Sequence, residues 1–155
     1  MGGNFNKMRA FKIKEIILVD DDSIVKLVVQ RILKKIGYSD PITTFSNGLE
    51  AINSIKNQVA TNSFNFFPEK RLLLLDINMP IMDSWGFLEE FSTLPFEVKN
   101  QFLISIITSS ISDQDKSQAF TYPDVKDFIQ KPLSETYLLH FLTKHALYEG
   151  NQTSE

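Results

Sequence analysis

The sequence predicts an α/β fold, namely a doubly wound sheet of five parallel strands with helices between them. Two features of the sequence support this fold class. Five short apolar runs alternate along the chain with segments whose apolar residues recur at helical spacing. The run at 72–75 consists of four leucines, which is typical of a strand that is buried on both faces of a parallel sheet.

The first two strand–helix units have clear boundaries. An apolar, β-branched strand at 15–19 stops at a run of aspartates, and a helix at 23–36 follows, with Gly37 as its C-terminal stop. A second strand is expected at 42–45. A second helix begins at Asn47-Gly48.

The third unit follows a longer connection. Segment 57–71 is polar and aromatic, so we expect it to end the second helix and to form a loop whose phenylalanines fold back on the core. The leucine strand at 72–75 then ends at Asp76. Either Asp83 or Ser84 can cap a third helix.

The last two units repeat this plan. We expect strands at 102–107 and 125–129, with a weaker helix at 113–120 between them. Ser134 caps a final helix with an apolar face.

The composition is that of one globular domain. Hydrophobic residues make up 43% and charged residues 23% of the 155 positions, which suffices for a sizeable core. The chain has no cysteine, which excludes disulfides, thiolate nucleophiles and cysteine-ligated metal sites. A net charge of −3 argues against nucleic acid as the main partner, because binding to a phosphate backbone needs a basic face.

The expected location is the cytoplasm. No apolar run approaches the roughly 20 residues that span a bilayer, and the first residues lack the apolar core of a signal peptide. We expect one domain at 13–147, an N-terminal extension at 1–12 and a polar tail at 148–155.

Polar side chains follow four of the five expected strands. Three aspartates at 20–22 follow the first strand, Asp76 the third, Thr108 the fourth, and Lys131 lies near the end of the fifth. Ligands of open α/β sheets bind beyond these carboxyl ends. Carboxylates on strands about 4.8 Å apart repel each other unless a cation neutralises them, and Mg²⁺ suits such an oxygen site. An aspartate between a metal and a lysine can attack phosphorus and form an acyl phosphate.

Four motifs carry a resemblance to a known family. They are ILVDDDS at 17–23, LLLLDINMPIMD at 72–83, IITSS at 106–110 and FIQKP at 128–132. In order and spacing they resemble the CheY-like receiver domain of two-component response regulators, over about residues 14–144. The resemblance implies a flavodoxin-like (βα)5 fold with strand order 2-1-3-4-5.

The resemblance also implies a metal site around Asp76, the expected phosphorylation site. Asp21 and Asp76 would ligate Mg²⁺ directly, and the backbone carbonyl of Asn78 would be a further ligand. Asp20 would reach the metal through water. Mn²⁺ is an alternative metal.

Further implied roles concern the phosphoryl group. Thr108 would turn towards it, and Lys131, placed by a cis peptide bond to the following proline, would form an ion pair with it. The rotamer of Phe128 would follow activation, so that Thr108 and Phe128 form a switch. Asn78 and Ser110 would tune the lifetime of the phosphoryl group.

Two positions depart from the family pattern. Ser84 stands where the family usually has a glycine, so a turn that needs positive φ would strain it. Phe128 carries no hydroxyl group with which to bind a partner.

The function implied is that of a stand-alone response regulator. A sensor histidine kinase or a histidine phosphotransfer protein would phosphorylate Asp76, and the modified surface would bind a downstream protein. We expect no enzymatic activity beyond self-phosphorylation from phosphodonors and autodephosphorylation, and no direct contact with nucleic acid or membrane. The chain would be a monomer or a phosphorylation-dependent dimer.

Three other functions are considered. A receiver-like docking module would ignore phosphate. A phosphatase of the haloacid dehalogenase kind would need an acid two residues after Asp76, where Asn78 stands. A flavodoxin-like cofactor binder would need a Ser/Thr/Gly phosphate loop after the first strand, where three aspartates would repel a phosphate.

Overall fold

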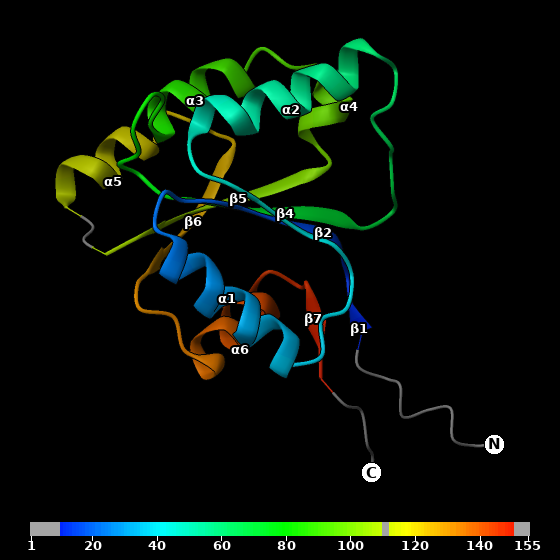
Figure 1. The fold of residues 1–155 in the computed structure, drawn as a ribbon, viewed down its shortest axis with the longest axis vertical. Helices are drawn as coiled ribbons and strands as arrows, with labels where there is room; N and C mark the ends of the chain where they lie inside the picture. The colour runs from blue at the N-terminus through cyan, green and yellow to red at the C-terminus, as the bar shows by residue number, and fades with distance from the viewer. Residues whose placement is uncertain (1–9, 110–111, 151–155) are drawn as a thin grey trace.

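The computed structural model describes residues 10–109 and 112–150. Within these ranges, five parallel strands form one sheet in the order β3-β2-β4-β5-β6 (Figure 1), which confirms the order 2-1-3-4-5 when the strands of this sheet are counted along the chain. Its strands are β2 (Ile13–Val19), β3 (Ile42–Phe45), β4 (Lys70–Leu75), β5 (Phe102–Thr108) and β6 (Val125–Gln130). The helices are α1 (Ser23–Lys35), α2 (Gly48–Ala60), α3 (Ser84–Phe91), α4 (Phe96–Lys99), α5 (Asp113–Ala119) and α6 (Glu135–Lys144).

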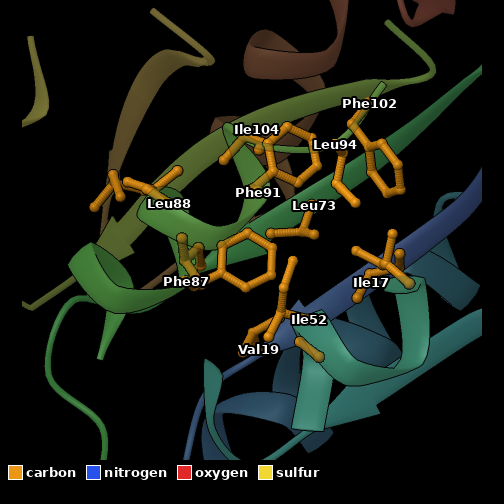
Figure 2. Close-up of a cluster of buried hydrophobic side chains, with 14 of the residues drawn as sticks. Ile17, Val19, Ile52, Leu73, Phe87, Leu88, Phe91, Leu94, Phe102 and Ile104 are labelled. Carbon is orange, nitrogen blue, oxygen red and sulfur yellow. The ribbon is translucent and has the colours of Figure 1, made fainter. Parts of the chain in front are cut away.

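Helices cover both faces of this sheet. In Figure 1, α1 and α6 lie on one face, while α2, α3 and α4 lie on the other. Ile17 and Leu73 belong to the core beneath α2 and α3, which Figure 2 shows, whereas Ile16 and Leu72 belong to the core beneath α1 and α6. The leucine run at 72–75 is apolar at every position because both of its sides are buried.

The parallel register aligns the carboxyl ends of the central strands. Val19 of β2 pairs with Leu75 of β4, and Leu75 pairs with Ile106 of β5. Asp20 and Asp76 each follow directly on these paired residues. Both carboxylates therefore leave the sheet at the same edge.

A short antiparallel ribbon joins the two ends of the described chain. In it, β1 (Ala10–Phe11) pairs with β7 (Tyr148–Glu149). The ring of Phe11 packs against Tyr38 and Tyr148, at centroid distances of 5.4 and 4.9 Å. This ribbon could not be predicted from the sequence, because strands of two residues carry no periodic pattern.

The helices largely follow the prediction, with one addition. α2 ends at Ala60, inside the segment 57–71 that was expected to contain its end, and Val59 still packs against the core. α4 was not predicted, since one turn with a single buried residue, Val98, gives no helical signal.

Across the described residues, no helix combines the length and the apolar character needed to cross a bilayer.

The buried Arg71 organises the loop that precedes β4. Its guanidinium lies 4.2 Å from the centroid of Phe64 and 4.9 Å from that of Phe67, and its Nε lies 3.3 Å from a carboxylate oxygen of Glu15. Phe64 also packs on the core, as expected, but Phe66 is 58% exposed. The loop is therefore held by an enclosed cation as well as by apolar burial.

The loop after β4 packs closely on the start of α2. The amide of Gly48 donates to the carbonyl of Met82 at 2.9 Å. A Cβ atom on Gly48 would lie 2.9 Å from that same oxygen and 3.0 Å from the carbonyl oxygen of Asp83. A side chain therefore fits at position 48 only if the loop moves.

We expect Gly48→Ala to lower the free energy of unfolding by about 1–3 kcal/mol, because the added methyl group displaces a hydrogen-bonded carbonyl. Asn53→Ala, at an exposed position of the same helix, is the matched control. It should leave stability unchanged or slightly raised, because alanine favours the helix. Urea unfolding followed by circular dichroism measures both variants, and a fully stable Gly48→Ala protein would contradict the close contact.

Candidate functional site

Three carboxylates meet at the carboxyl edge of the sheet. Asp20 and Asp21 follow β2 and Asp76 follows β4, and each contributes an oxygen to a cluster whose atoms lie within 4.8 Å of one another. Asp20 and Asp76 are buried, with 3% and 8% of their surface exposed, whereas Asp21 is exposed. The parallel pairing of β2 and β4 produces this cluster, since both strands end at the same level.

One ammonium group neutralises part of this charge. Nζ of Lys131 lies 2.8 Å from Oδ2 of Asp20 and 3.4 Å from Oδ1 of Asp76. Burial works to lower the pKa of Lys131, but the hydrogen bond and charge of Asp20 outweigh it and raise that pKa. Lys131 is therefore held in its charged form between the two buried carboxylates.

The backbone around Lys131 places its side chain. Its amide donates to the carbonyl of Thr108 at 2.8 Å, which ties the end of β6 to the end of β5. The Lys131–Pro132 peptide bond is cis, as the family resemblance implied. Thr108 itself is buried at the carboxyl end of β5.

The three consecutive aspartates have separate roles. Oδ1 of Asp20 accepts the amide of Asp22 at 2.9 Å, and its Oδ2 binds Lys131. Asp22 caps α1 by accepting the amide of Ile24 at 2.9 Å. The exposed carboxylate of Asp21 joins the acidic cluster from the solvent side.

The pKa of Asp76 is far above its ordinary value. Burial and the charge of Asp20 raise it from 3.8 to about 6, although Lys131 and the backbone amide of Ile77 favour the ionised form. When no cation is bound, the carboxylate therefore gains a proton in mildly acidic solution.

The cluster fits a hard divalent cation. Three carboxylates face one ammonium group, so an excess of negative charge remains, and the side-chain donors are carboxylate oxygens, which Mg²⁺ prefers. Both oxygens of Asp20 already have partners. The carboxylate of Asp21 is exposed and faces the cluster from the solvent side.

The remaining predicted residues lie in the loop after β4, in β6 or outside the described residues. Asn78 is exposed in the loop after β4. Phe128 is half-buried in β6, and its ring meets the exposed ring of Phe120 edge-on, at a centroid distance of 6.3 Å. Ser110 lies outside the described residues.

The loop after β4 corrects the expectation about Ser84. Ser84 does not have positive φ. It is buried as the first residue of α3, and its amide donates to the carbonyl of Ile77 at 3.1 Å. The strained position is instead Ile81, with φ of 70° and 78% of its surface exposed. The sequence offered no signal for it, because a β-branched residue is unusual at positive φ.

The comparisons with known proteins agree on one family. The family model described as response regulator receiver domain matches residues 16–143. Among curated proteins, the chain is 28% identical over 138 residues to a sensor histidine kinase, CheAY, of Helicobacter pylori, covering 89% of this chain but only 16% of that relative. It is 27% identical over 132 residues to two-component response regulator 24 of Arabidopsis thaliana, covering 85% of this chain and 84% of the relative.

Solved structures share the fold. A two-component response regulator from Cytophaga hutchinsonii superposes with a TM-score of 0.70 at 25% identity, covering 85% of this chain and 96% of that chain. The receiver domain of sensor histidine kinase PA1611 from Pseudomonas aeruginosa, described with a magnesium ion coordinated in its active site cleft, gives a TM-score of 0.65 at 20% identity and covers 85% and 96% of the two chains.

We expect Ser84→Ala to raise the free energy of unfolding by about 1 kcal/mol, because its buried hydroxyl has no hydrogen-bond partner among the described residues. Ser105→Ala is the matched control. Ser105 is equally buried, but its hydroxyl donates to the carbonyl of Ile106 at 3.3 Å, so its loss should lower stability. Thermal unfolding measures the stability of both variants. Two variants of equal stability would contradict the unpaired state of the Ser84 hydroxyl among the described residues.

In metal-free buffer, Asp76→Asn should raise the free energy of unfolding at pH 7.5 by roughly 2 kcal/mol. The pKa of Asp76 is higher in the folded chain, so its stabilising contribution is complete below pH 3.8 and is lost as the pH rises through about 6. The difference between the two proteins should therefore shrink towards pH 4.

Asp22→Asn is the control, because it removes a carboxylate at an exposed position near the same edge of the sheet. Urea unfolding in EDTA across this pH range measures all three proteins. A difference that stays constant with pH would refute the raised pKa of Asp76.

Proposed function

The chain belongs to the response regulator receiver domain family of two-component signalling, and on this basis we propose that it is switched by phosphorylation of Asp76. The phosphoryl group comes from a sensor histidine kinase or a histidine phosphotransfer protein. The phosphorylated chain then presents a changed surface to a downstream protein. The observation that carries this proposal is the buried carboxylate of Asp76, which lies beside two further carboxylates and 3.4 Å from the Lys131 ammonium.

The chemical step is a transfer between two side chains. A carboxylate oxygen of Asp76 attacks the phosphorus of a phosphohistidine, so that a P–O bond forms and the P–N bond breaks. The imidazole leaves with the electron pair and takes up a proton. The product is an acyl phosphate on Asp76 and a neutral histidine on the donor.

A bound Mg²⁺ would reduce the repulsion between the acidic cluster and the incoming phosphoryl group. Asp21 and Asp76 would hold it directly, with the carbonyl of Asn78 as a further ligand and Asp20 acting through water. The partners already bound to both oxygens of Asp20 support its indirect role. Mn²⁺ has similar ligand preferences and is the alternative metal.

Lys131 and Thr108 respond to the new charge. Lys131 shifts from Asp20, at 2.8 Å, towards the phosphoryl oxygens, and the Thr108 hydroxyl donates to one of them. Phe128 follows, because it lies in β6 three residues before Lys131 and its half-buried ring rests against Phe120. The phosphoryl group thus biases a two-state surface formed by β6 and the end of α5.

Asn78 and Ser110 set the lifetime of the acyl phosphate in this proposal, and the chain acts as a monomer or as a dimer that forms on phosphorylation. A complex of the chemotaxis proteins CheX and CheY from Borrelia burgdorferi, whose CheY is 22% identical to this chain, illustrates a protein partner for this fold.

Incubation with acetyl phosphate and Mg²⁺ should add one phosphoryl group to the protein, detected by intact mass. Omission of Mg²⁺ should reduce the adduct by at least about tenfold, because the acidic cluster then repels the donor. Asp76→Asn should abolish the adduct. Asp22→Asn, which keeps a helix cap, should retain it.

A phosphorylated Asp76→Asn protein would overturn the assignment of the acceptor. Absence of an adduct from folded protein that binds Mg²⁺, even with a competent histidine kinase, would instead favour a docking module that ignores phosphate.

A further inference from the structure

A cavity lies at the opposite edge of the sheet from Asp76. It has a volume of about 460 Å³ and is lined by residues at the amino-terminal ends of β4, β5 and β6, and by α4. In Figure 1, α4 lies at the side of the sheet away from α5, which follows the carboxyl end of β5. Its volume falls in the range of small-molecule sites.

Three lysines from different elements line this cavity. Lys70 begins β4, Lys99 ends α4 and Lys126 lies in β6, and Asp124 supplies the one lining carboxylate in the described chain. Across residues 10–109 and 112–150, none of these three lysines takes part in an ion pair, in contrast to Lys131. The cavity therefore has a surplus of positive charge in a chain whose net charge is −3.

Backbone carbonyls hold these ammonium groups in place. Nζ of Lys99 donates to the carbonyl of Ser92 at 3.2 Å, and Nζ of Lys126 donates to that of Pro123 at 3.0 Å. Lys70 donates to the carbonyl of Asn100. Each ammonium group has three donors, so these single bonds leave capacity for an anion.

One wall of the cavity is aromatic. Phe96 of α4 is 73% exposed, while Phe91 and Phe102, which also line the cavity, are buried in the core, where Figure 2 shows their rings. An exposed phenylalanine beside three lysines gives the cavity both a flat apolar surface and a cationic side. Inorganic phosphate would use the lysines alone and leave most of the volume empty.

We propose that this cavity binds a mononucleotide-sized anion, with its phosphates at Lys70, Lys99 and Lys126 and its aromatic ring on Phe96. The site is independent of the phosphorylation site, because the two lie at opposite edges of the sheet.

The test measures binding of ADP by isothermal titration calorimetry in EDTA, so that no metal bridges the nucleotide to the acidic cluster. The parent protein should bind one ADP. Lys99→Gln/Lys126→Gln should bind it at least about tenfold more weakly, because two charged contacts to phosphate are lost. Lys34→Gln/Lys116→Gln removes the same charge from α1 and α5 and should bind ADP within about twofold of the parent.

Phe96→Ala separates the aromatic contact from the charges. Phe96 is exposed, so the variant should fold, and its affinity for ADP should fall about fivefold or more. Inorganic phosphate should compete with ADP only weakly, and Phe96→Ala should not change the affinity of the site for inorganic phosphate.

Three results would overturn the proposal. They are no binding of ADP, equal weakening by both lysine pairs, and inorganic phosphate binding as tightly as ADP. The acetyl phosphate adduct on Asp76 should form equally in the parent and in the Lys99→Gln/Lys126→Gln protein. Failure of one site can therefore be told apart from failure of the other.

Discussion

The contact of Lys131 with two buried carboxylates is the interaction on which the acidic edge depends. Parallel pairing of β2 with β4 brings carboxylate oxygens of Asp20 and Asp76 within 4.8 Å of each other. The repulsion between these two negative charges opposes the register that buries both strands. Lys131 follows β6, which is separated from β4 by β5, so its side chain reaches across the end of β5 to both carboxylates. The carboxylate that follows β2 is thus neutralised by the ammonium group that follows β6.

Much of the fold and part of the site could be predicted from the sequence. The leucine run at 72–75 predicted a buried strand, because burial on both faces requires an apolar residue at every position. Asp76, which follows this run, predicted the functional end of the strand. The proximity of Asp20, Asp76 and Lys131 followed from parallel topology. The positive φ of Ile81 could not be predicted, because the backbone there is set by packing of the loop on α2 rather than by local preference.

The two edges of the sheet use cations in different ways. At the carboxyl edge, Lys131 lies among carboxylates and remains near solvent. At the amino edge, Arg71 is enclosed by aromatic rings and bound to Glu15, and it serves to fix a loop. The lysines of the neighbouring cavity share neither environment, since backbone carbonyls hold them beside an exposed ring. The groups that surround each positive charge therefore decide what it does.

The ribbon of β1 and β7 determines how the domain responds to a pulling force. Ala10 pairs with Glu149, so the two ends of the described chain leave the fold side by side. Tension applied through both ends would open this antiparallel pair one residue at a time, as a zipper opens, because its hydrogen bonds lie along the direction of pull. The parallel sheet would bear load only after the ribbon had separated. The ribbon is therefore expected to open at a lower force than the core.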